Sequence, residues 1–165
     1  MNFTYRFPAV KGQQAGREYY ISMVPLKLLA RLFPSEEEIV PPEHRAQRRI
    51  NEARIPEIKK YILDNRDSYV FSALSASIDG TYSFTQLMGS DVGVLEVDME
   101  AVFLINDGQH RKAAIEAAMQ EDPTLEKETI ILSINLYFFY SHNISRTNRR
   151  QHAIPIHAYA YLFIR

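Results

Sequence analysis

The residues best suited to chemistry form one short polar run between two apolar segments. The run is Asp107, Gly108, Gln109, His110 and Arg111. Residues 101–105 before it are typical of a short buried strand, and residues 113–119 after it of an Ala-rich helix. A turn from strand into helix directs backbone N–H groups outward at the positive end of the helix dipole. We therefore predict an anion site here, for phosphate in particular.

Two members of the run fit a phosphate site, and a purely structural role is the alternative. Gly108 permits unusual backbone angles or a close approach to a ligand. Arg111 adds a planar donor fork that suits phosphate. However, Asp-Gly is an ordinary turn dipeptide, and Asp107 or Asn106 would also serve as a simple helix cap. The local chemistry leaves both interpretations open.

The same run contains a candidate catalytic group. His110 is suited to general acid or base work, with Asp107 three residues earlier to orient it. No nucleophile lies nearby in the sequence. The chain has no Cys, which excludes disulfides, thiolate metal sites and Cys nucleophiles. A Walker phosphate loop is absent, and the other His residues lack metal-ligand spacing. We expect a binding protein rather than an enzyme, and no metal site.

A second informative region is basic. Residues 43–66 hold seven Lys and Arg residues against four Asp and Glu, although the whole chain has a net charge of −1. A surface for nucleic acid must therefore be local, and this region favours contacts to phosphates. The alternative is a solvated helix face with i,i+4 pairs such as Arg48–Glu52. The candidate DNA-contacting residues are Arg45, Arg48, Arg49 and Arg54.

The elements that position these residues alternate between strands and helices, which predicts a mixed α/β or α+β domain. Pro56 disfavours helical angles at Ile55, so we expect a break there between two helical pieces. Asp79-Gly80 is a tight-turn dipeptide between two strand-like segments and predicts a β-hairpin. In chain order we expect two strands within residues 1–23, a short helix at 26–33, helical pieces in 43–66, a hairpin in 67–87, strands at 94–97 and 101–105, the Ala-rich helix, and a strand at 129–132.

Composition limits the setting of the protein. A chain of 165 residues with 46% apolar content suits one domain with a real core. It shows neither a secretory signal nor an apolar stretch of about 18 residues that spans a bilayer, so we expect a cytoplasmic protein without a membrane partner. All 20 acidic residues lie between Glu18 and Glu128, and residues 129–165 contain none.

The Asp107–Arg111 run and its flanks resemble the DGQHR-domain family, and most closely its DndB-like members, bacterial proteins of DNA sulfur modification. The resemblance covers roughly residues 2–130. Beyond the run itself, it rests on residues 5–10, 15–20, 46–49, 54–58, 61–62 and 71–74.

This resemblance implies a role beside the phosphorothioation system, which replaces a non-bridging DNA phosphate oxygen with sulfur. It implies a DNA-binding transcriptional regulator of the modification gene cluster, with promoter DNA and other DNA sulfur-modification proteins as partners. The run is also similar to loops of the ParB and sulfiredoxin superfamily, whose strand–loop–helix core holds nucleotide phosphate. A nucleotide-binding or nucleotide-hydrolysing enzyme is thus one alternative, with a nucleotide as its cofactor. An inactive truncated remnant is another.

The resemblance weakens after about Leu132, where the acid-free segment begins. We therefore predict an N-terminal part of a DGQHR (DndB-like) domain in residues 1–132 and an atypical tail in residues 133–165. The hypothesis for the tail is a truncated gene or a change of reading frame. Reading the encoding DNA in its other two frames across these codons tests it, and failure to recover a family-like continuation contradicts it.

Overall fold

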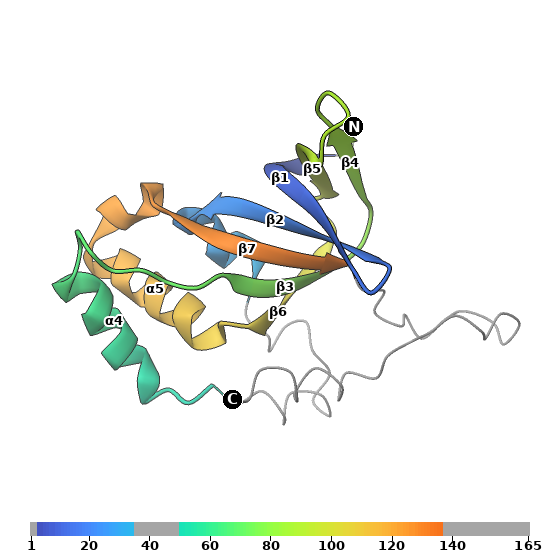
Figure 1. Cartoon of the computed structure of the whole chain (residues 1–165). Helices are drawn as coiled ribbons and strands as arrows, with labels where there is room; N and C mark the ends of the chain where they lie inside the picture. Colours follow the sequence, from blue (N-terminus) through green and yellow to red (C-terminus); the bar gives the residue numbers. More distant parts are fainter. Residues whose placement is uncertain (1–2, 35–49, 137–165) are drawn as a thin grey trace, which may run out of the picture.

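The first hairpin forms the middle of the sheet in the computed structural model, which describes residues 3–34 and 50–136 (Figure 1). Strands β1 (Thr4–Gln14) and β2 (Arg17–Pro25) pair antiparallel around the two-residue turn Ala15-Gly16. Both turn residues have positive φ, 51° and 75°, which matches the twist of a tight hairpin. The two strands predicted within residues 1–23 are confirmed, and the second continues to Pro25.

Seven strands of the described ranges form one mixed sheet in the order β4-β5-β1-β2-β7-β3-β6. The pair β3–β7 is parallel, and the other neighbours are antiparallel. The mixed α/β class is confirmed. The remaining strands are β3 (Leu74–Asp79), β4 (Tyr82–Gln86), β5 (Val92–Asp98), β6 (Val102–Asp107) and β7 (Thr129–Leu136).

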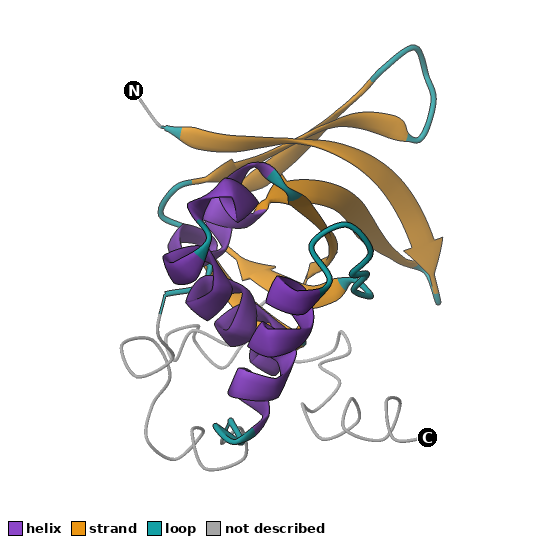
Figure 2. Ribbon diagram, turned by 90° about the vertical axis from the view of Figure 1, so that its left-hand side faces the viewer, coloured by secondary structure: helices purple, strands orange, loops and turns teal. Residues whose placement is uncertain are grey.

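The helices gather on one side of this sheet (Figure 2). After Pro25 a short 3-10 turn, η1 (Leu26–Leu28), leads into α1 (Leu29–Leu32), which confirms the predicted short helix. Helices α4 (Arg54–Asp64) and α5 (Gln109–Glu121) pack along each other. The turn η2 (Pro123–Lys127) then connects α5 to β7.

The core lies between these helices and the sheet. The helices contribute fully buried side chains, and alternate residues of β2, β5 and β7 are buried. The sheet also curls, as a contact between two distant strands shows. The ring of Phe103 on β6 packs edge-on against Tyr5 on β1, with centroids 6.2 Å apart. Three strands separate these two in the sheet order. Representative core residues are Leu29, Ile62, Leu74, Ile115, Leu125 and Leu132.

The predicted hairpin in residues 67–87 is wrong. Strand β3 lies between β7 and β6, whereas β4 pairs with β5 at the opposite edge. Gly80 has a φ of 149° and passes so close to Ala101 that an added Cβ would lie 2.5 Å from the Ala101 Cβ. Asp79-Gly80 therefore forms a corner between two strands that are not neighbours in the sheet. The burial of the two strands agrees with this arrangement, because β3 is mostly buried and lies inside the sheet, whereas β4 is mostly exposed and lies at its edge.

The predicted helix break near Ile55 also needs correction. Helix α4 begins at Arg54 and runs through Ile55 and Pro56 without interruption. Proline is tolerated in a first helical turn because its missing N–H has no intrahelical partner there. The break lies just before Arg54, where residues 52–53 form a turn. Most of the first predicted helical piece lies outside the described residues.

Candidate phosphate site at the β6–α5 turn

The predicted strand–turn–helix unit is present, with a single residue as its turn. Strand β6 ends at Asp107 and α5 begins at Gln109, so Gly108 alone makes the connection. Gly108 has a φ of 99°, in the left-handed region that favours glycine. An added Cβ would also lie 2.4 Å from the Leu74 Cδ2. Both the backbone angle and the close packing therefore require glycine.

Arg111 uses its donor fork within the protein. Its Nη1 donates to the Ser72 carbonyl at 2.6 Å, the Ser72 Oγ at 2.5 Å and the Ala73 carbonyl at 3.0 Å. Its Nη2 donates to the Asp107 Oδ2 at 2.8 Å. The side chain is only 17% exposed. Arg111 thus fastens the first turn of α5 to the segment that enters β3 and holds Asp107 beside it.

The acidic and amide side chains of the turn have partners other than the helix end. Gly108 is the N-cap of α5, and no side chain caps that end. Asp107 bonds Arg111, and the Asn106 Nδ2 donates to the Ser77 Oγ at 2.7 Å. The alternative role of these two residues as simple caps is therefore wrong. No side chain therefore caps the start of α5, where the positive end of the helix dipole lies.

His110 joins the turn to the basic region. The His110 Nε2 accepts a hydrogen bond of 2.9 Å from the backbone N–H of Asn51. Asn51 lies just before α4, whose first residue, Arg54, is exposed. The structure thus places the start of α4 against the first turn of α5. The other predicted DNA-contacting residues, Arg45, Arg48 and Arg49, lie outside the described residues.

Lysines of α4 and α5 pair with acids of their own or the neighbouring helix. Lys59 of α4 pairs with Glu121 of α5. Lys60 pairs with Asp64 at 2.5 Å, and Lys112 pairs with Glu116 at 3.0 Å. These i,i+4 and interhelical pairs match the solvated-face alternative for much of the basic region.

Comparison with known proteins decides the family. The model of the DndB family, described as DNA-sulfur modification-associated, matches residues 7–153. The chain belongs to the DndB family. The match contains the β6–α5 turn and the basic segment, and it continues past Leu132 into the predicted tail. No curated protein and no solved structure matches the chain.

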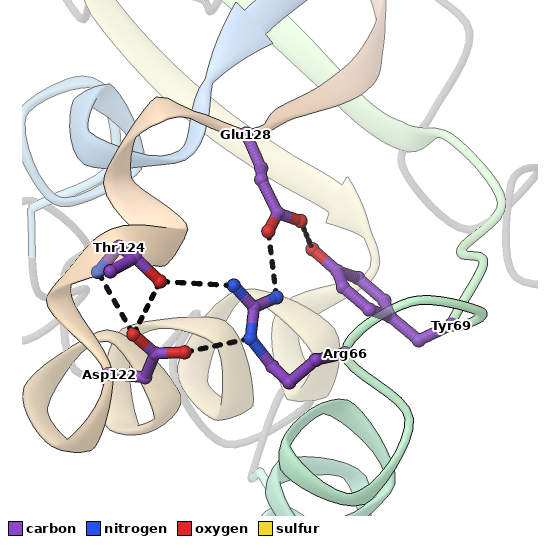
Figure 3. A network of polar contacts seen from close by, with 5 residues as sticks. All are labelled: Arg66, Tyr69, Asp122, Thr124 and Glu128. Atoms are coloured by element: carbon purple, nitrogen blue, oxygen red, sulfur yellow. Dashed lines mark hydrogen bonds and ion pairs between the residues drawn. The ribbon is translucent and has the colours of Figure 1, made fainter.

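A second polar cluster of this DndB-family chain lies at the far end of α5 (Figure 3). The Arg66 Nε donates to the Asp122 Oδ2 and its Nη1 to the Glu128 Oε1, both at 2.7 Å. Its Nη2 reaches the Thr124 Oγ1 at 3.2 Å, and the Tyr69 hydroxyl donates to the other Glu128 oxygen. The cluster ties the end of α4 to the connection between α5 and β7.

The contacts of this cluster shift the pKa values of Tyr69 and Asp122. Burial, then the hydrogen bond to Glu128, raises the pKa of Tyr69 to about 12. The hydrogen bond from the Thr124 hydroxyl, with help from Arg66, lowers the pKa of Asp122. A pocket of about 520 Å³ lies beside the cluster, between residues 66–71 and 127–131. Sequence reasoning missed these contacts because Arg66 and its acidic partners are 56 and 62 residues apart.

The described ranges contain neither a metal-binding cluster nor a membrane-spanning helix. No group of three or more His, Asp or Glu residues within residues 3–34 and 50–136 is arranged to hold a metal ion. Among the helices of the described part, none combines the length and apolar character needed to cross a membrane.

Proposed function

We propose that this DndB-family chain binds promoter DNA and regulates the genes of DNA sulfur modification. The observation that carries the proposal is the hydrogen bond between Asn51 and His110. It supports a shared surface because it places the start of the basic helix beside the β6–α5 turn. The family is associated with DNA-sulfur modification, so the phosphate backbone of DNA is the ligand that we propose for this surface.

Each residue of the turn has a distinct role in this proposal. The start of α5, at the positive end of the helix dipole, faces a DNA phosphate. Gly108 lets the backbone approach that phosphate. Arg111 is a positioning residue, since its guanidinium already bonds Ser72 and Asp107. Gln109 and His110 flank the phosphate, and His110 also aligns the basic segment.

Cationic side chains supply most of the affinity. Arg54 is exposed at the start of α4, and Arg45, Arg48 and Arg49 precede it in the chain. Each phosphate neutralised by such a side chain releases counterions, so affinity falls as salt rises. The net charge of the chain is only −1, so the rest of the protein repels the DNA backbone only weakly.

Fluorescence anisotropy with a duplex from the promoter of the modification genes tests the proposal. The natural chain should bind with an affinity that falls steeply between low and physiological salt. Arg54→Ala, or Arg48→Ala with Arg49→Ala, should weaken binding and reduce the salt slope by about one per lost contact. Lys127→Ala is the matched control, because Lys127 is exposed on η2, beyond the end of α5 that lies away from the turn. Absence of binding at low salt contradicts the proposal.

One observation favours a second function, nucleotide binding by a ParB/sulfiredoxin-like core. The β6–α5 junction, a strand joined to a helix through a left-handed glycine, is suited to a nucleotide phosphate as well as to DNA. Calorimetry with nucleoside triphosphates distinguishes the two. The second function would be favoured if the natural chain binds or hydrolyses a nucleotide, loses that activity in His110→Ala, and does not bind DNA. A chain without a cooperative unfolding transition would support the inactive remnant instead.

A further inference from the structure

The side of the sheet away from the helices exposes an apolar patch. Its members are five large side chains on four neighbouring strands, each between 42% and 62% exposed. We call this set the outer patch. It consists of Val92 on β5, Val10 on β1, Ile21 and Met23 on β2, and Ile131 on β7.

Strand register makes the outer patch continuous. Val10 lies directly opposite Val92 on one side and Ile21 on the other. Met23, two residues after Ile21 on the same face, lies opposite Ile131. Four strands at a spacing of about 4.8 Å make the patch roughly 15 Å wide. Together the five side chains expose on the order of 400 Å² of apolar surface, a size at which patches on monomers are often functional.

The centre of the outer patch is electrically neutral. Along the described strands, none of the cross-strand partners of these five residues is charged. Four residues from Val10 on the same face, Arg6 forms a 2.8 Å ion pair with Glu96. On the other side the row continues from Ile21 to Ser133 and Ser75. Arg17, four residues from Ile21 on the same face, and Lys127 beside Ile131 lie at the margin of the patch. The five members themselves include no Lys or Arg, which DNA and an anionic membrane need at the centre of a contact.

We propose that the outer patch binds a second copy of this chain in a twofold-symmetric dimer. In such a contact the same patch faces itself, so an uncharged patch buries no unpaired ion. Two sheets pack face to face about 10 Å apart with nearly aligned strands, which a four-strand apolar patch permits. A standard interface takes about 800 Å² from each partner, so the patch would supply about half and its polar rim the rest.

The dimer extends beyond the proposed DNA binding and does not depend on it. The row that contains Val92, Val10 and Ile21 continues through Ser133 and Ser75 to Asp107 at the candidate turn. A dimer centred on the outer patch therefore contains two such turns, each outside the centre of the interface.

Analytical ultracentrifugation of the full chain without DNA tests the proposal. The natural chain should sediment as a dimer at micromolar concentration, and Met23→Glu should raise the dimer dissociation constant at least tenfold. Gln120→Glu, an exposed change on α5 at the helical side of the sheet, is the control and should remain dimeric. A natural chain that stays monomeric at 100 μM, or a Met23→Glu variant that stays dimeric, overturns the proposal.

Cross-linking provides a second test that does not require a charged substitution. The chain has no Cys, so Ile21→Cys or Met23→Cys introduces a single thiol into the patch. A short bis-maleimide should join two copies through either thiol, but not through Glu57→Cys on the helical side. Equal cross-linking at all three positions, or none at residues 21 and 23, overturns the proposal. Neither experiment contains DNA, so a failure leaves the proposed DNA binding unaffected.

Discussion

The His110 Nε2 accepts a hydrogen bond from the backbone N–H of Asn51, 59 residues earlier in the chain. This contact makes the imidazole the link between the turn at the start of α5 and the segment that begins α4. It also fixes the tautomer, because a nitrogen that accepts from an N–H carries no proton of its own.

Replacing His110 should loosen this link. His110→Ala leaves the Asn51 amide without its acceptor, so we expect faster hydrogen exchange at Asn51 and a loss of about 1 kcal/mol of stability. Affinity for promoter DNA should fall as the start of α4 loses its orientation. Gln120→Ala, an exposed change on the same helix, is the control. Unchanged exchange at Asn51 would show that His110 does not hold this segment.

Gly108→Ala should destabilise the fold more than a comparable change elsewhere. The left-handed angle costs about 1 kcal/mol for alanine, and the contact with the buried Leu74 should add a similar amount. Gly16→Ala is a matched control, because Gly16 has a φ of 75° and no neighbour within 4 Å of an added Cβ. Urea unfolding of both variants measures the difference. Equal losses would mean that Leu74 moves aside without cost.

The Arg111 contacts should prove mainly structural. Arg111→Lys should cost about 1–2 kcal/mol of stability, because an ammonium cannot reach Ser72 and Asp107 together as the planar fork does. The coupling between Arg111 and Asp107 should be below about 1 kcal/mol and fall with salt, since Asp107 is 51% exposed. A double-mutant cycle with alanine at both positions measures it. A large coupling that salt does not reduce would contradict this assignment.

Alkaline pH should reveal the Tyr69–Glu128 bond. The pKa of Tyr69 is raised to about 12 in the folded chain, whereas an unfolded tyrosine titrates near 10. A raised pKa gives stability that is complete below pH 10 and is lost as pH rises through the folded pKa. Urea midpoints should therefore decline between pH 10 and 12, and less steeply in Tyr69→Phe.

Tyr20 and Tyr82 also have raised pKa values, mainly because of burial. Their ionisation lowers the urea midpoint by the same amount in the natural chain and in Tyr69→Phe. The difference between the two pH curves therefore reports on Tyr69 alone. Parallel curves for both proteins would contradict a contribution from its hydroxyl.

Local signals predicted the elements that carry the site. Alternating apolar residues located β1 and β2, and the apolar run before Asp107 with the Ala-rich segment after Gly108 located β6 and α5. Each of these patterns is complete within a dozen residues, so sequence alone sufficed.

Contacts between distant segments were not predictable in the same way. Arg111 binds backbone carbonyls at Ser72 and Ala73, and every residue type has such a carbonyl. No pattern of side chains therefore indicates that partner. The Asp79-Gly80 dipeptide indicated a tight turn, and we predicted a hairpin from it. That prediction failed because turn residues do not show which strands pair with each other. Local chemistry and the family resemblance both predicted a phosphate site at the turn. Arg111 as a phosphate ligand stays a prediction, and its guanidinium bonds Ser72 and Asp107 in the structure.

The place of β7 in the sheet affects how the chain folds as it is made. Strand β7 is the last described strand along the chain, yet it lies between β2 and β3. Until residues 129–136 leave the ribosome, the sheet exists as two separate parts, β4-β5-β1-β2 and β3-β6, each with an open edge. The β6–α5 turn belongs to the smaller part. Its rigid setting therefore arises only when the final strand joins the two parts, and synthesis halted before Thr129 would release two incomplete, aggregation-prone sheets.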